Sequence, residues 1–112
     1  MAKFLTIGYG DQAGYDGTPR ELRDAAHAQD AALVTRGAVM GMAGTPIQVR
    51  NHQADGVRTE SGAYLRSDLP VAGFAVIEAR DAHEAIRMVA TTPCAIAYGV
   101  VEVWPLIEPP TT

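Results

Sequence analysis

His27 and Asp30 lie three residues apart in a segment with helical periodicity, a spacing suited to proton transfer. Arg23 precedes His27 by four residues, so the three side chains can share one side of a helix. A partly buried imidazole beside a carboxylate keeps one tautomer and a raised pKa, which suits general acid or base catalysis near neutral pH. The alternative interpretation is a solvated surface histidine in a network with the arginine and the aspartate.

A second group of polar residues lies at the ends of predicted strands and in the longest polar connection of the chain: Tyr9, Asp11, Ser61, Tyr64 and Asp68. A few hydroxyls and carboxylates converging on an apolar pocket are typical of a small-molecule site. We therefore predict that Ser61 joins His27 and Asp30 in catalysis and that the other four bind substrate. The preference of Ser and Asp for turns explains the same residues without a ligand.

Metal ligands and phosphate-binding loops are not indicated. His52 and His83 have no partner at ligand spacing, and a single cysteine, Cys94, excludes paired-cysteine motifs. We expect no metal and no cofactor, and we interpret Cys94 as a packed side chain rather than a nucleophile. The glycines that follow the first strand do not form the G-x-G-x-x-G pattern of a dinucleotide site.

Composition narrows the class of protein further. The chain has 112 residues, of which 47% are hydrophobic and 20% charged, as in one ordinary domain. Its net charge of −4 argues against nucleic acid as a partner. Apolar runs too short for a bilayer, no recognisable signal peptide and a lone cysteine favour a cytoplasmic protein that does not bind membranes. We predict one domain over residues 1–112, with an ordered core to residue 108 and a frayed tail over residues 109–112.

The first elements that must position these side chains are a strand over residues 3–9 and a helix over residues 19–36. Thr18 and Glu21 have the spacing of a capping box around Pro19, and Gly37 is a typical C-terminal cap. The predicted inward face of this helix consists of residues at helical spacing, namely Leu22, Ala25, Ala26, Gln29 and Leu33.

The second half of the chain repeats this pattern after a hairpin. Asp81 and Glu84 predict another capping box, and Pro93 predicts the end of the helix that it begins. The predicted elements are a strand over residues 38–42, a hairpin of residues 47–50 and 57–60, a loop over 61–70, a strand over 72–78, a helix over 82–91 and a strand over 99–107.

This order predicts an α+β domain: a ferredoxin-like βαββαβ sandwich with an antiparallel sheet. Two right-handed crossovers place both helices on one face of such a sheet. The strands are nevertheless apolar at consecutive positions, as in residues 74–77, 100–101 and 103–104, so the second face also needs a cover. A second copy of the sheet is the simplest cover, and we predict a homodimer. Apolar edges by chance, or the hairpin folded over the face, are the alternatives.

Three stretches of the sequence are similar to the YCII-related family, and in particular to its DGPF-type branch: KFLTIGYGDQAG (residues 3–14), GVRTESGAY (56–64) and VAGFAVIEARDAHEAIRMVATTP (71–93). The last strand, GVVEVWPLIEP, resembles that family's last strand. The resemblance implies a dimeric α+β barrel with a His and Asp pair between the first helix and the sheet. His27 is the counterpart of the histidine, although its spacing to Gly37 is about one residue shorter. Ser61 replaces the acidic residue of the Asp-Gly-Pro-Phe pattern.

Two functions are compatible with these features. The first is a cofactor-independent enzyme that performs a proton-transfer step on a small molecule, as an isomerase, lyase or cyclase of secondary metabolism. The second is a non-catalytic dimer that binds a metabolite or a protein. Fold class does not decide between them, because the same fold serves unrelated activities.

Overall fold

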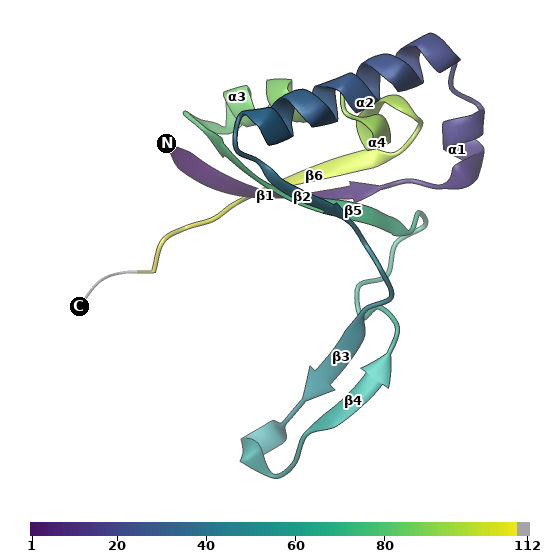
Figure 1. Cartoon of the computed structure of the whole chain (residues 1–112). Coiled ribbons are helices and arrows are strands. Elements are labelled where there is room, and N and C mark those ends of the chain that lie inside the picture. The colour runs from purple at the N-terminus through teal and green to yellow at the C-terminus, as the bar shows by residue number, and fades with distance from the viewer. Residues whose placement is uncertain (110–112) are drawn as a thin grey trace.

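The computed structural model describes residues 1–109 and shows an α+β protein (Figure 1). Four strands form one sheet in the order β2-β5-β1-β6, with antiparallel pairing between every pair of neighbours. These strands are β1 (Ala2–Tyr9), β2 (Val39–Met42), β5 (Val71–Ala79) and β6 (Val100–Pro105). Strands β3 (Ile47–Arg50) and β4 (Arg58–Ser61) pair only with each other, around a short 3-10 turn, η1 (His52–Ala54).

The helices lie together on one side of the four-stranded sheet (Figure 1). They are α1 (Gln12–Asp16), α2 (Arg20–Thr35), α3 (Ala82–Val89) and α4 (Pro93–Ile96). None of the helices within residues 1–109 is long and apolar enough to cross a membrane.

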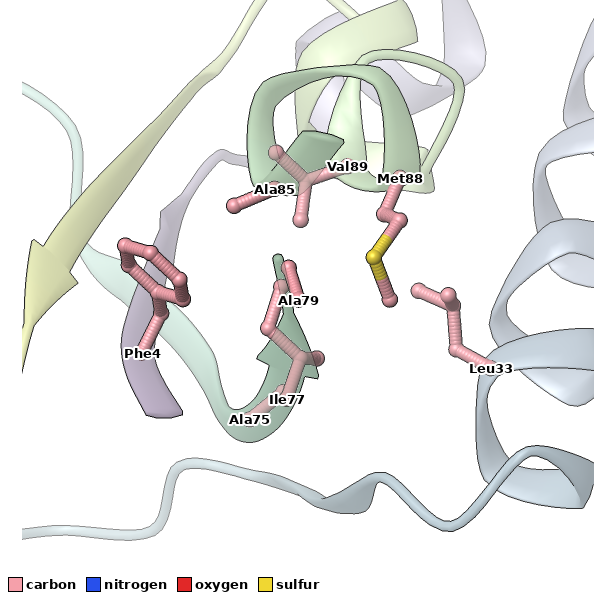
Figure 2. Packing of buried hydrophobic residues seen from close by; sticks show 8 residues of the cluster. All are labelled: Phe4, Leu33, Ala75, Ile77, Ala79, Ala85, Met88 and Val89. Atoms are coloured by element: carbon pink, nitrogen blue, oxygen red, sulfur yellow. The ribbon is translucent and has the colours of Figure 1, made fainter. Parts of the chain in front are cut away.

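A small apolar core packs helix α3 and the C-terminal end of α2, at Leu33, against the sheet (Figure 2). Phe4 of β1 and Ile77 of β5 are cross-strand neighbours that point toward the helices. Leu33 of α2 and Met88 and Val89 of α3 pack against them. Full burial of a side chain such as Ile77 contributes about 2 kcal/mol, so this cluster fixes the distance between helix and sheet.

The opposite face of the sheet, which we call the open face, is apolar and exposed. Strand register places Leu5 beside Val76 and Trp104, and Ile7 beside Phe74, all on this face. Phe74 and Trp104 are about half exposed, at 46% and 53%. The expectation of strands that are apolar on both faces, with helices on only one, is therefore confirmed.

Strands β3 and β4 and the turn between them form a two-stranded arm, residues 47–61. The arm extends from the sheet on the side away from the helices (Figure 1). Its register pairs Ile47 with Ser61 and Arg50 with Arg58. The arm does not fold over the open face, so the alternative in which the hairpin covers this face is wrong.

Most predicted elements are confirmed within one or two residues at their ends, including both strands of the hairpin and the long helix. The glycine cap of α2 is also confirmed, since Gly37 has φ +106°. The predicted tail falls on residues 109–112, of which only Pro109 is within the described residues.

Some local predictions are wrong. Thr18 does not cap α2; its hydroxyl instead donates to the carbonyl of Gly14, which leaves Pro19 as the N-cap within the described chain. Helix α1 lies between the first predicted strand and the first predicted helix, where no element was predicted. Pro93 does not simply end a helix but begins α4, because proline favours the first helical position. Leu22, expected to face inward, is 49% exposed.

Candidate functional site

A cleft of about 630 Å³ lies between helix α2 and the helix-facing side of the sheet. Its walls are mainly apolar and include Leu33, Met40, Ala75, Ile77, Val89 and Val101. Helix α1 and helix α4 bound it with Tyr15 and Cys94. A mainly apolar hollow with a few polar groups is the usual form of a small-molecule site.

Helix α1 brings Tyr15 against the predicted catalytic histidine. The Tyr15 hydroxyl lies 2.9 Å from His27 Nε2, within hydrogen-bond distance. Asp11 positions Tyr15, because its carboxylate accepts a hydrogen bond from Gly14 N (2.8 Å) and starts the helix. Arg23 lies over the Tyr15 ring, with Cζ 4.9 Å from the ring centroid. Tyrosine, histidine and arginine therefore form one contact group at the cleft.

Asp30 is the half-buried acid of the cleft. Loss of hydration raises the pKa of its carboxyl, and the nearby His27 opposes this rise. Both residues project from α2 and both line the cleft, but His27 is exposed and not partly buried as predicted. The i, i+3 spacing seen in the sequence therefore does bring the predicted pair into one cavity, where a carboxylate with a raised pKa is a stronger base than a solvated one.

Cys94 packs over Gly8 of β1 in the same cleft. Burial raises the pKa of its thiol, and the negative charge of Asp30 raises it further. The thiol therefore stays protonated at neutral pH, when it is a poor nucleophile.

The remaining predicted site residues divide between two regions. Asp11 lines the cleft, as its place after β1 suggested. Ser61 lies at the end of β4, Tyr64 packs beside Arg50 of the arm (Cζ 5.7 Å from the ring centroid), and Asp68 is exposed in the loop that leads to β5. Within residues 1–109 these three lie outside the lining of the cleft, so the structure does not bring them together with His27.

Tyr9 also points away from the cleft. Its hydroxyl donates to Glu102 Oε1 at 2.5 Å, and Trp104 Nε1 donates to the same oxygen at 3.3 Å. The hydrogen bond to Glu102 raises the pKa of Tyr9, with smaller contributions from desolvation and from the charge of Glu102. This places the Tyr9 hydroxyl with Glu102 and Trp104, on the open face.

Sequence reasoning missed Tyr15 and placed Cys94 only as a packing residue. The signal for Tyr15 was Asp11 three residues before Gly14, a capping pattern for a short helix that glycine in its middle obscures. Within residues 1–109, no group of three or more His, Cys, Asp or Glu side chains is arranged to hold a metal ion.

No protein-family model matches this chain, and no curated protein is significantly similar to it. The similarity to the YCII-related family therefore stays a prediction from the sequence.

Proposed function

We propose that this protein is a cofactor-independent enzyme that moves a proton on a small, largely apolar carbonyl compound held in the cleft. The observation that carries the proposal is the Tyr15–His27 hydrogen bond of 2.9 Å beside the half-buried Asp30. An acid and a base with different surroundings in one apolar cavity are the smallest set of catalytic groups that an isomerase, a lyase or a cyclase needs.

In the proposed step Asp30 moves the proton, and Tyr15 with His27 stabilises the charge that develops. Asp30 takes a proton from a carbon next to the carbonyl, and the electron pair moves to the carbonyl oxygen. The Tyr15 hydroxyl, hydrogen-bonded to His27, stabilises that oxygen as charge develops. Asp30 then returns the proton to the enolate, at the original carbon or at a conjugated one, which restores its carboxylate.

Proton exchange in D₂O tests this proposal without knowledge of the natural substrate. A panel of small apolar ketones and lactones is incubated with the protein, and loss of the proton next to the carbonyl is followed by ¹H NMR. We expect exchange above the uncatalysed rate for part of the panel, and a loss of about 100-fold or more in His27→Ala and in Asp30→Asn. His83→Ala, which removes an exposed histidine of α3, is the control and should exchange at the native rate.

Equal exchange in His27→Ala, Asp30→Asn and His83→Ala would contradict the assignment. Compounds that bind, by saturation-transfer NMR, without exchanging a proton would favour the second function, a metabolite-binding module.

The finer description of the fold belongs to the same proposal. We infer a ferredoxin-like arrangement, supported by the strand order β2-β5-β1-β6 and by helices on one face. We also infer a dimer of dimeric α+β barrel type, formed by two open faces. The exposure of Phe74 and Trp104 supports it, because contiguous apolar surface on a protein usually marks an interface.

A further inference from the structure

The arm, residues 47–61, has one apolar face and one charged face. Cross-strand neighbours share a face, so Ile47 and Val49 lie with Ser61 and Thr59. Ile47 and Val49 are 67% and 65% exposed. This alternation is the pattern of a ribbon with one buried side, although in the described chain the side is open to water.

The charged face of the arm is satisfied by its own contacts. Arg50 donates to Gln48 Oε1 at 2.8 Å and lies 3.6 Å from a carboxylate oxygen of Glu60. Gln48 in turn donates to the carbonyl of Gly62 at 3.1 Å. These contacts order Gln48, Arg50 and Glu60 on the charged face, whereas Ile47 and Val49 on the apolar face are exposed.

A two-stranded ribbon of this length is marginally stable alone in water. The arm pairs with no other strand among residues 1–109, and it stands clear of the four-stranded sheet (Figure 1). Packing of its apolar face on another surface is the simplest way to stabilise it.

The exposed apolar area of the molecule indicates which surface the arm packs on. Four open-face side chains, Val39, Phe74, Val100 and Trp104, are about half exposed or more. At roughly 100 Å² each they supply about half of the roughly 800 Å² per partner that a standard interface buries. The three exposed apolar side chains of the arm, Ile47, Val49 and Val57, bring the total close to that area. The arm extends on the same side of the sheet as the open face, so one partner can contact both.

We propose that the arm packs its Ile47 and Val49 face against a second copy of this chain, so that the arm of each protomer contacts the other protomer. The inference rests on the proposed dimer and adds the arm to its interface.

The test compares two substitutions that change the net charge of the arm equally. Val49→Glu places a charge on the apolar face, whereas Arg58→Gln changes the opposite face. Sedimentation equilibrium of the full chain should show a dimer dissociation constant raised at least tenfold in Val49→Glu and changed less than twofold in Arg58→Gln. In the native chain, arm amides should be protected from hydrogen exchange only at concentrations where the dimer forms.

Other results would show that the apolar face of the arm packs on a different surface. If Val49→Glu associates like Arg58→Gln while Phe74→Glu dissociates, the dimer stands and the arm proposal is overturned. If Val49→Glu lowers the melting temperature of the monomer without affecting association, the arm packs on its own chain, which also overturns the proposal. A native chain that stays monomeric overturns the arm and the dimer together, and leaves the cleft enzyme to be judged by proton exchange.

Discussion

At the scale of single residues, the cleft combines one pair of neighbouring side chains that sequence spacing predicts with one hydrogen bond that it does not. His27 and Asp30 come together because residues three apart on a helix are neighbours. Tyr15 reaches His27 only through the turn from α1 into α2, a geometry set by Asp11 and by the Thr18 hydroxyl bond to Gly14. Contacts between residues far apart in the sequence do not follow from spacing. For the same reason, the sequence places Ser61 with His27, although Ser61 lies on the arm.

Asp30 gives a prediction about stability and pH. Burial raises its folded pKa above 3.8, so the folded state favours the protonated carboxyl. That contribution is fully present below the unfolded pKa and is lost as pH rises through the folded pKa. At pH 7 the ionised carboxylate therefore costs stability, and Asp30→Asn should be more stable than the native chain at pH 7 but nearly equal to it at pH 3.

The expected gain at pH 7 is less than about 1 kcal/mol, because a half-buried carboxylate keeps part of its hydration. Urea unfolding at the two pH values measures it. Asp24→Asn, on an exposed part of the same helix, is the matched control. A gain at pH 3 as large as at pH 7 would show that the amide acts through packing and not through charge.

At the scale of elements, the strands and the two longer helices were predictable because hydrophobic pattern and end signals agree. Asp81 is a clear case, since its carboxylate accepts from Glu84 N at 2.8 Å, a bond that lowers the pKa of Asp81. Glu84, however, accepts from the backbone N–H of Arg80 rather than from that of Asp81, so only half of the predicted capping box forms. Helices α1 and α4 were missed because five and four residues are too few for a periodic pattern.

Strand β5 passes close to β2 at a pair of glycines, and this contact gives a second prediction. A Cβ on Gly73 would lie 2.7 Å from the carbonyl oxygen of Gly41, which is too close for the strand pair as it stands. We expect Gly73→Ala to lower the free energy of unfolding by about 2 kcal/mol, as other overpacked sites do. Gly44→Ala is the control, because a Cβ there meets open space among the described residues.

Urea unfolding of the two alanine variants measures the difference. If Gly73→Ala and Gly44→Ala unfold at the same denaturant concentration, β2 moves freely enough to admit a methyl group, and the edge of the cleft that carries Met40 and Met42 is not rigid.

At the scale of the whole molecule, the sequence predicted a sheet with two apolar faces but not the position of the arm. The first prediction depends only on which residues occupy alternate positions, and strand register confirms it. The direction of the arm depends on its flanking loops, residues 43–46 and 62–70. Their backbone angles do not follow from a hydrophobic pattern, so the sequence is also compatible with an arm folded over the sheet.

The open face leads to the last prediction, which concerns stability as a function of protein concentration. If two open faces form the dimer, mass action makes the native melting temperature rise with protein concentration. Phe74→Glu puts a charge into the middle of this face, where it would be buried without a partner. The melting temperature of this variant should therefore become independent of concentration.

Leu22→Glu is the matched control: Leu22 is 49% exposed, as Phe74 is 46% exposed, but it lies on α2, away from the open face. Calorimetry across a 100-fold range of concentration should show the native dependence in Leu22→Glu and none in Phe74→Glu. The same dependence in both variants would mean that the chains associate through another surface, and the apolar residues of the open face would then need a different partner.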